Sequence, residues 1–557
     1  MSAVDPLHTH PTTQPNASSA PATRRPRVSG YAAALAALLI VTGATIVGGM
    51  LRSSATFDEI VAVAGGARGY QTGDWAVMPE HPPLTLYLYG LPVYLSGINY
   101  PPEIGPIGGP GVPMARRYEY ARDLYWELGN DPERVALLAR LPAVLCALAL
   151  IALASLFTRS VAGPSAGLLA ALLVAALPDV LAHGGVAYND LPMALALFAA
   201  VWATDAAVRR PGWRSAVVAG ALIGIAAGVK NSAVALAPIG VILLSWEALA
   251  RPRDVAWRKA VGAAALVAVV VAYLTLVVVF RGDVLLVEYR SGLRWAFGHT
   301  HEMRVPAYLL GQRSEGGWWY YFPVAFIFKT SAGLHVLMVL ALGTFAVAAR
   351  RRQLSLVAPL RPMVVLASVF LALLLMSDLN IGFRHAMPVL PPLCVMTAVG
   401  VHRLWRTAGR ALGAVVVAST SWMVIHVAGH YPHFLAYLSE YRPGVEGNYQ
   451  VLADSSLDWG QGLLELRDFM HENGIASVYL SYFGSAPPSG YGIAYVPWES
   501  VLTLATLEEP VPTPRWAAIS ATNLAGQYLR RDPFARFREV RPDRVLARTI
   551  YLYRIED

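Results

Sequence analysis

The run YAAALAALLIVTGATIVGGML, residues 31–51, contains no charged side chain and decides the class of fold. A helix of about 20 apolar residues crosses the hydrocarbon core of a bilayer. No convincing small-residue cleavage site follows it, which favours a membrane anchor over a cleaved signal peptide. Arg24, Arg25 and Arg27 precede the run and predict that it starts in the cytoplasm. Residues 1–30, rich in Pro, Ser, Thr and Ala, predict a disordered cytoplasmic tail.

Similar apolar runs recur along the chain. Hydrophobic residues make up 55% of the sequence and charged residues only 14%, whereas a soluble domain carries about 25% charged residues. The sequence therefore predicts an α-helical polytopic membrane protein with about eleven transmembrane helices. The predicted spans begin near Tyr31, Val135, Gly163, Leu191, Ser215, Val234, Val261, Ser331, Met363, Met387 and Ala411.

The connections between these runs alternate in charge. Every second connection is short and basic, which predicts a cytoplasmic location. The basic connections contain Arg159, Arg209–Arg214, Arg251–Lys259, Arg350–Arg352 and Arg403–Arg410. Two of the opposite connections, residues 52–134 and 281–330, are long and aromatic, and stretches such as Leu84–Tyr89 predict helices lying in the membrane interface.

The chain after the last span has an ordinary soluble composition. We therefore divide the protein into a transmembrane domain, residues 31–430, and a C-terminal domain, residues 431–557. Patterning predicts a strand at 448–453, a helix at 460–472 and a strand at 476–483. Because the number of spans is odd, this small α/β domain is expected outside the cytoplasm.

A pair of carboxylates follows the first span, in Thr56-Phe57-Asp58-Glu59. Charges at the membrane boundary are costly unless they are solvated, paired or functional. Transfer of a sugar to a hydroxyl requires a carboxylate that takes the proton of the acceptor as the anomeric bond breaks. Asp58 could instead cap an interfacial helix.

A second polar group lies in Met78-Pro79-Glu80-His81-Pro82-Pro83-Leu84. The consecutive prolines fix the backbone and give Glu80 and His81 a set direction. A rigid loop in front of an interfacial helix explains the prolines, but it does not explain the acid and the imidazole.

An ordered series of motifs resembles the GT-C glycosyltransferases, above all the protein O-mannosyltransferases (family 39) and the lipid A aminoarabinose transferases. After the Asp-Glu pair and Glu-His-Pro-Pro-Leu, the series continues to about Gly492. The later motifs are Gly317-Trp318-Trp319-Tyr320-Tyr321-Phe322-Pro323, Phe328-Lys329-Thr330, Ile381-Gly382-Phe383-Arg384-His385 and Asp454-Ser455-Ser456-Leu457-Asp458-Trp459-Gly460-Gln461.

The resemblance implies a catalytic set of Asp58, Asp190 and Glu59. Asp58 matches the catalytic aspartate of the first outer loop of the family, and Glu59 supports it. Asp190 resembles a second acidic position near the sugar, although it could also cap a helix before Leu191-Pro192.

A polyprenyl phosphate requires cations where its head group leaves the apolar region. Lys230 and Lys329 are two of only three lysines and are expected at outer membrane boundaries, where snorkelling is the alternative explanation. The aminoarabinose transferases carry a lysine at the position of His81. The predicted substrate-binding residues are Glu80, His81, Lys230, Lys329, Arg384, His385 and Tyr320.

The resemblance leaves a divalent metal open, with Glu80, His299 and His301 as the candidate ligands. A His-x-His pattern in a loop is a weak metal signature, and nothing in the sequence brings Glu80 close to it. Solvated or hydrogen-bonded histidines are the competing explanation.

The sequence thus predicts an inverting glycosyltransferase of a bacterial inner membrane, with a polyprenyl-phosphate sugar as donor. It leaves the sugar open, and the acceptor could be a protein hydroxyl, a lipid or a polysaccharide. The scattered basic clusters argue against nucleic acid as a partner. A transporter or flippase would place charges mid-span at broken helices, and a non-catalytic assembly subunit would keep the fold without the chemistry.

Overall fold

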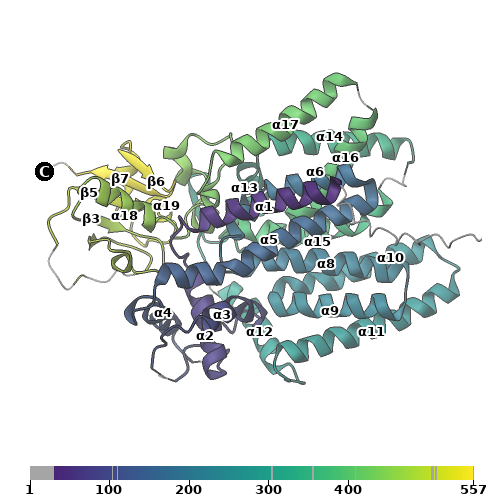
Figure 1. Cartoon of the computed structure of the whole chain (residues 1–557), viewed down its shortest axis with the longest axis horizontal. Helices are drawn as coiled ribbons and strands as arrows, with labels where there is room; N and C mark the ends of the chain where they lie inside the picture. The colour runs from purple at the N-terminus through teal and green to yellow at the C-terminus, as the bar shows by residue number, and fades with distance from the viewer. Residues whose placement is uncertain are drawn as a thin grey trace, which may run out of the picture.

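The computed structural model describes residues 30–555 except 103–104, 110, 303–304, 354–356, 408, 503–506 and 508–510. Apart from residue 30, the predicted tail therefore lies outside the described residues. Figure 1 shows long helices running side by side along the long axis, with a β-sheet at one end, which we call the sheet end. This architecture confirms the predicted polytopic helical fold with a small C-terminal sheet domain.

Nine helices within the described residues are long and apolar enough to cross a membrane. Three of them begin with a 3₁₀ turn, so that η2 (Asn231–Ala235) leads into α10, η4 (Ala358–Leu360) into α15 and η5 (Phe383–Val389) into α16. The nine are α1 (Gly30–Met50), α5 (Pro132–Ala162), α8 (Asp190–Arg209), α10 (Leu236–Ala250), α11 (Val255–Val279), α14 (Ala332–Arg350), α15 (Arg361–Leu375), α16 (Leu390–Thr407) and α17 (Arg410–Ala428).

The two other predicted spans are shorter apolar helices, α6 (Pro164–Ala175) and α9 (Trp213–Val229). Helix α6 stops early, and α7 (Pro178–His183) continues the path after a break. Pro178 has no backbone N–H with which to extend the hydrogen-bond ladder of α6, which explains the break. The predicted spans are therefore confirmed in position, while two of them fall short in length.

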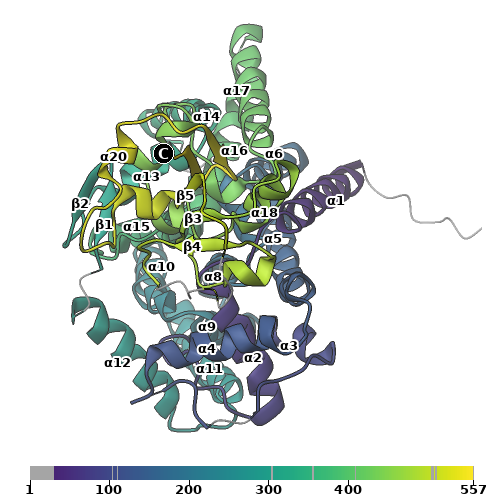
Figure 2. The same ribbon diagram turned by 90° about the vertical axis from the view of Figure 1, so that its left-hand side faces the viewer.

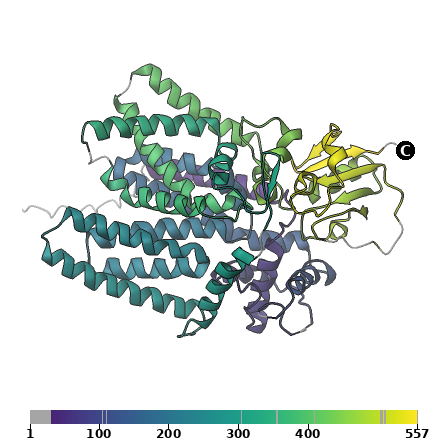
Figure 3. The same ribbon diagram turned by 180° about the vertical axis from the view of Figure 1, so that it is seen from behind.

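Helix α9 packs closely on α11 through glycines spaced four residues apart, Gly220, Gly224 and Gly228. A Cβ atom at Gly220 would lie 2.4 Å from the carbonyl oxygen of Ala268 in α11, and one at Gly224 would lie 2.5 Å from Thr275. Small residues at this spacing allow helix backbones in a membrane to approach each other. This pair forms one edge of the bundle (Figure 1 and Figure 3).

Buried ion pairs connect the bundle at both ends. At the end opposite the sheet, Arg361 of α15 pairs with Asp205 of α8 and Glu247 of α10. At the sheet end, Lys230 after α9 pairs with Asp190 at the start of α8. A buried charge is tolerated when a partner compensates it, and these pairs link α8 with α9, α10 and α15.

The two long connections predicted to lie outside the membrane fold into short elements. Figure 2, which views the sheet end, shows α2, α3 and α4 gathered beside the sheet domain. Residues 52–134 form α2 (Glu59–Thr72), α3 (Leu84–Leu95), α4 (Met114–Arg122) and the π-helix η1 (Asp123–Glu127); residues 281–330 form α12 (Val287–Glu302), β1 (Ala307–Leu309), β2 (Gln312–Ser314) and α13 (Tyr321–Lys329).

The C-terminal domain contains a mixed five-stranded sheet in the order β4-β3-β5-β7-β6. Strand β3 is parallel to β4 and β5, and β7 is antiparallel to β5 and β6. The strands are β3 (Val478–Ser481), β4 (Tyr495–Pro497), β5 (Trp516–Ser520), β6 (Arg544–Leu546) and β7 (Ile550–Arg554). The helices are η6 (Phe434–Ala436), η7 (Val445–Gln450), η8 (Asp454–Ser456), α18 (Leu463–Glu472), η9 (Pro488–Tyr491), α19 (Ala521–Ala525) and α20 (Ala535–Arg538).

Two of the three elements predicted for this domain are found. Helix α18 and strand β3 lie within the predicted ranges, but the predicted strand at 448–453 is wrong, because these residues lie in η7 and an irregular segment. The alternating apolar side chains are buried by packing rather than by strand pairing, as when the ring of Tyr449 meets that of Tyr551 at 5.3 Å.

Candidate active site

Two acidic and two basic predicted site residues meet at the sheet end of the bundle. Nη1 of Arg384 lies 3.5 Å from Oδ2 of Asp58 and 3.8 Å from Oδ2 of Asp190. Nζ of Lys230 lies 2.5 Å from Oδ1 of Asp190. The N-cap of α2, the start of α8, the residue that follows α9 and η5 supply these four side chains. We call this group the charged cluster.

Asp58 is the accessible carboxylate of the charged cluster. Its side chain is 24% exposed, whereas that of Asp190 is 2% exposed. Asp58 occupies the N-cap position of α2, but its side chain makes no capping hydrogen bond. Asp190 is the first residue of α8 and pairs with Lys230 instead of capping the helix. Neither aspartate side chain therefore caps a helix, although helix capping was the alternative explanation for both.

Glu59 is fully buried and paired with Arg140 of α5. Arg140 Nε and Nη2 donate to the two carboxylate oxygens at 2.8 and 2.7 Å. The backbone amides of Thr56 and Ala187 add bonds of 3.0 and 2.9 Å. Burial raises the pKa of Glu59, but the Arg140 charge and these bonds outweigh it, so the pKa lies below its ordinary value. The pair joins α2 to α5 next to the charged cluster.

Glu80 and His81 face the same region from the loop before α3. Arg117 Nη1 donates to Oε1 of Glu80 at 2.7 Å. His81 Nε2 lies 3.1 Å from the hydroxyl of Tyr188, just before α8. Burial first, and then the nearby Lys230 charge, lower the pKa of His81 to about 3. His81 is therefore a neutral imidazole at physiological pH and does not replace the charge of a lysine.

The Asp454–Gln461 motif forms a wall of this site and contributes no cap to α18, which begins after Gly462. The guanidinium of Arg384 lies 4.1 Å from the ring centroid of Trp459 and 5.3 Å from that of Tyr188. Phe57 N donates to Trp459 O at 2.9 Å, and Phe383 N donates to Oγ of Ser456 at 2.9 Å. The motif thus binds the backbone beside Asp58 and the backbone beside Arg384.

The other predicted substrate-binding residues lie in different settings. Lys329 is fully buried and donates to the carbonyls of Leu435 and Ser456, both at 2.9 Å, behind the charged cluster. It therefore does not snorkel. Tyr320 is 37% exposed and its neighbour Trp319 is 69% exposed. His385 is near Lys230, Arg384 and Asp190, and its buried Nε2 has no hydrogen-bond partner within the described structure.

Some buried polar atoms at and beside the charged cluster have no hydrogen-bond partner within the described structure. Such atoms are rare in folded proteins, and each retains a free donor or acceptor position. Within the described residues they include Glu80 Oε2, His183 Nε2, Asn189 Oδ1, Asp190 Oδ2, Asn231 Oδ1, Arg384 Nε and His385 Nε2. Donors and acceptors are both present, as the recognition of a phosphate and a sugar requires.

The candidate metal ligands receive no support as a group. Glu80 pairs with Arg117, while His299 and His301 lie on α12, in a part whose side chains are not described. Among the side chains that are described, no three His, Cys, Asp or Glu residues are arranged to hold a metal ion.

Four residues of this site were not predicted individually: Arg117, Arg140, Tyr188 and Trp459. Arg140 carried a signal, because a charged residue inside an apolar run requires a partner. Trp459 belonged to a motif whose contacts the sequence could not specify. Nothing in the sequence connected Arg117 with Glu80 or Tyr188 with Arg384.

Comparison with known proteins supports the predicted relationship over part of the chain. Residues 120–277 match the family described as dolichyl-phosphate-mannose-protein mannosyltransferase. This segment contains Asp190 and Lys230 of the charged cluster, but it contains neither Asp58 nor Arg384. No curated protein matches the chain.

Solved structures give distant likenesses. ArnT from Cupriavidus metallidurans bound to undecaprenyl phosphate has 17% identity and a TM-score of 0.47, over 76% of this chain and 68% of that chain. Oligosaccharyltransferase AglB from Archaeoglobus fulgidus, in complex with an inhibitory peptide and a dolichol-phosphate, has 13% identity and a TM-score of 0.47, over 74% and 57%. The match at residues 120–277 confirms the predicted resemblance to the protein O-mannosyltransferases over that part of the chain.

Proposed function

We propose that this protein transfers a sugar from a polyprenyl phosphate to an acceptor hydroxyl at the charged cluster, on the extracytoplasmic side of the membrane. The observation that supports it best is the arrangement around Arg384. One accessible carboxylate, Asp58, contacts Arg384, and Asp190 connects Arg384 with a second cation, Lys230, at the end of an apolar helix bundle. A lipid-phosphate substrate requires such an arrangement, with cations for the phosphate and a base beyond them.

The chemistry is a single displacement with inversion. Asp58 accepts the proton of the acceptor hydroxyl while the acceptor oxygen attacks the anomeric carbon. The bond between the anomeric carbon and the phosphate oxygen breaks, and polyprenyl phosphate leaves with the bonding electrons. Arg384 and Lys230 stabilise the charge that develops on the phosphate, and the low dielectric of the membrane boundary strengthens this effect.

Asp190 holds the two cations in place in this proposal. Its carboxylate contacts Lys230 at 2.5 Å and Arg384 at 3.8 Å, and it is buried away from the acceptor side. A phosphate entering between the two cations would share them with Asp190. Glu59, which is paired with Arg140, would fix the first turn of α2 and hence the position of Asp58.

The charge of the connections supports the proposed sidedness. The predicted cytoplasmic basic clusters, such as Arg350–Arg352 after α14 and Arg209–Arg214 between α8 and α9, follow helices that run away from the sheet end. The positive-inside rule then places the sheet end outside. A bacterial inner membrane and a cytoplasmic N-terminus form part of the same proposal.

A divalent metal is proposed only in a supporting role. Glu80 Oε2 has no hydrogen-bond partner among the described residues and could contribute one oxygen ligand. Chelation followed by readdition of Mn²⁺, Mg²⁺ or Zn²⁺ tests this directly, because a metal-dependent chain would lose and regain transfer.

The function is tested with the purified chain in lipid nanodiscs. It is incubated with a panel of polyprenyl-phosphate monosaccharides and hydroxyl acceptors, and the lipids are analysed by mass spectrometry. We expect one donor to be converted to polyprenyl phosphate with its sugar on an acceptor. In vesicles, a flippase would instead move the intact donor between leaflets. Movement of the donor without release of its sugar would contradict our proposal and favour a flippase.

A further inference from the structure

Two arginines of the C-terminal domain meet at the end of α17 that faces this domain. Arg548, in the turn between β6 and β7, donates from Nη2 to the carbonyl oxygen of Gly429 at 3.0 Å, just after the last residue of α17. Arg442, in the segment before η7, donates from Nη1 to Nε2 of His430 at 3.3 Å. Both arginines are half-buried, and both lie close to His430. We call Arg442 and Arg548 the arginine pair.

No carboxylate forms an ion pair with the arginine pair among the described residues. The acids near it, Glu440 and Glu465, are engaged by other groups. Glu440 accepts from the backbone N–H of Ala332 at 3.0 Å and from Nε1 of Trp422 at 2.7 Å. Glu465 pairs with His433 at 2.7 Å. The arginine pair is therefore left without a counter-ion of its own.

The pKa of Arg548 reflects this uncompensated charge. Burial first, and then the charge of Arg442, lower the pKa of Arg548 below its ordinary value. Burial acts in the same direction on Arg117, but there the charge of Glu80 outweighs it and the pKa is raised. Burial also lowers the pKa of His430 to about 3, so this imidazole is neutral at physiological pH. Two cations thus share one neutral side chain, and an anion would relieve their repulsion.

The end of α17 compensates only part of the charge. The aligned peptide dipoles of a helix place about half a negative elementary charge at its C-terminus, whereas the arginine pair carries two positive charges. Each guanidinium has five N–H donors, and each makes one hydrogen bond within the described structure. The remaining donors have the forked geometry that matches the oxygens of a phosphate group.

The turn that carries Arg548 is strained. Ala547 and Arg548 have positive φ angles of 47° and 61°, although both carry a Cβ atom. Hairpin turns with two consecutive positive φ angles favour Asn and Gly. Strain of this kind persists where the surrounding structure or a function requires it. Here it accompanies the placement of Arg548 against the end of α17.

The arginine pair lies at the boundary of the membrane. Figure 2 shows α17 projecting from the rest of the bundle, and its side chains Trp422 and Ile425 are 51% and 65% exposed. Tyr431, just beyond the helix, is 47% exposed, as is typical of the aromatic belt at a membrane interface. Cations on a spanning helix reach this level by snorkelling, but the arginine pair approaches it from the C-terminal domain. Lipid head groups are therefore the anions next to it.

We propose that the arginine pair binds the phosphate of an anionic phospholipid in the leaflet that adjoins the C-terminal domain. The acyl chains lie along the exposed face of α17, and the bound lipid seats the β6–β7 turn on the membrane. An anionic lipid is favoured over a zwitterionic one because the arginine pair repels the choline cation of phosphatidylcholine. No residue of the charged cluster takes part, so this binding does not rest on the proposed sugar transfer.

The test is photolabelling of the full chain in phosphatidylcholine nanodiscs. Phosphatidylglycerol or phosphatidylcholine, each with a diazirine close to the head group on one acyl chain, is included, and labelled peptides are identified by mass spectrometry. We expect phosphatidylglycerol to label residues 422–431 at least about tenfold more strongly than phosphatidylcholine, because two arginines favour the anionic head group. Residues 410–417, at the other end of α17, serve as an internal reference.

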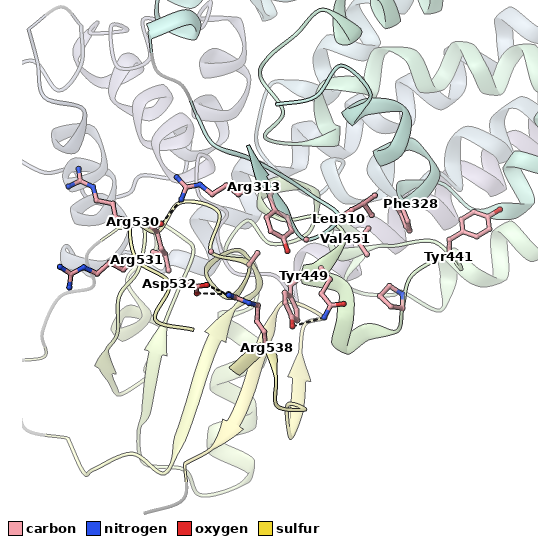
Figure 4. A pocket seen from close by; sticks show the side chains of 17 residues that line it. Leu310, Arg313, Phe328, Tyr441, Tyr449, Val451, Arg530, Arg531, Asp532 and Arg538 are labelled. Atoms are coloured by element: carbon pink, nitrogen blue, oxygen red, sulfur yellow. Dashed lines mark hydrogen bonds and ion pairs between the residues drawn. The ribbon is translucent and has the colours of Figure 1, made fainter. Parts of the chain in front are cut away.

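The variant Arg442→Gln/Arg548→Gln should lose this preference at residues 422–431 and keep the labelling of residues 410–417. The matched control is Arg530→Gln/Arg531→Gln, which removes two exposed arginines of the same domain. Figure 4 shows both of these side chains well apart from Tyr441, the neighbour of Arg442. Arg442→Lys/Arg548→Lys keeps the charge and should retain part of the preference, which separates lipid binding from effects on folding.

Each outcome decides the proposal. Equal labelling of residues 422–431 by the two lipids in the folded parent chain would overturn it, whatever the variants do. An unchanged preference in the folded Gln variant would also overturn it. Displacement of the label by inorganic phosphate would assign the site to free phosphate and not to a lipid. Asp58→Asn should be labelled like the parent chain, so a failure of sugar transfer leaves the lipid site standing.

Discussion

The guanidinium of Arg384 lies 4.1 Å from the centroid of the Trp459 ring, and this contact joins the C-terminal domain to the helix bundle at the proposed active site. The same Arg384 reaches Asp58 at 3.5 Å. The orientation of the cation beside the proposed base therefore depends on a residue of the C-terminal domain.

Replacing Trp459 should reduce transfer without removing a reacting group. A desolvated cation–π contact contributes about 2 kcal/mol, so Trp459→Leu should lower kcat roughly 30-fold through the misplaced Arg384. Trp459→Phe keeps an aromatic face and should recover part of the rate. The measurement compares the initial transfer rates and the unfolding temperatures of both variants. If Trp459→Phe and Trp459→Leu were equally stable and equally active, Trp459 would not position Arg384.

Breaking the Glu59–Arg140 pair should destabilise the fold. An unpaired charge left in a buried site costs about 3–5 kcal/mol, so Glu59→Gln and Arg140→Gln should each lower the unfolding temperature strongly. The double variant should be less destabilised than the sum of the single changes predicts. Asp58→Asn is the control, since its partly exposed side chain makes one contact of 3.5 Å with Arg384 rather than a fully buried pair with two short bonds. An unchanged unfolding temperature for Glu59→Gln would refute this assignment.

The two lysines should respond differently to neutralisation. Lys230→Gln removes a cation from the charged cluster and should raise KM for the donor about 10- to 100-fold, with partial recovery in Lys230→Arg. Lys329→Gln should instead lower stability, because two buried carbonyls lose their donor. Burial lowers the pKa of Lys329, in keeping with a structural role. A KM effect confined to Lys329 would reverse the two assignments.

Stability should fall as pH rises from about 4, the ordinary pKa of an aspartate, to about 7, through Asp454 and Asp458. Burial raises the pKa of Asp458 to about 7 and that of Asp454 to about 6. Because these pKa values exceed those in the unfolded chain, the folded state binds more protons, and the stabilisation present at low pH is lost as pH passes through them. Asp458→Asn should flatten the curve of unfolding temperature against pH. The exposed Asp468→Asn serves as control, and a parent curve without this fall would contradict the prediction.

The helical part of the fold could be predicted because apolar runs and basic connections directly reflect the bilayer. The lengths of α6 and α9 depended on local detail, such as Pro178, that a hydropathy count ignores. The failed strand at 448–453 shows the limit of alternation as a signal, because side-chain packing, as between Tyr449 and Tyr551, buries residues that a sheet would also bury.

The charged cluster could be predicted in composition but not in geometry. Asp58, Asp190, Lys230 and Arg384 were expected to act together, yet Asp58 and Arg384 are 326 positions apart in the chain, and only tertiary folding shows that they meet. The sequence treated Lys230 and Lys329 alike, whereas the structure places one in the cluster and the other on buried carbonyls. Local patterns do not record which side of a helix end a lysine reaches.

The most direct test of the account compares the parent chain with Asp58→Asn in a single turnover of bound polyprenyl-phosphate sugar. The substitution keeps the size of the side chain and removes the charge that accepts the proton. Donor binding and unfolding temperature should remain at parent values, while conversion to polyprenyl phosphate should slow by at least about 100-fold, the usual contribution of a general base. Conversion by Asp58→Asn at the parent rate would contradict the role of Asp58 and with it the proposed mechanism.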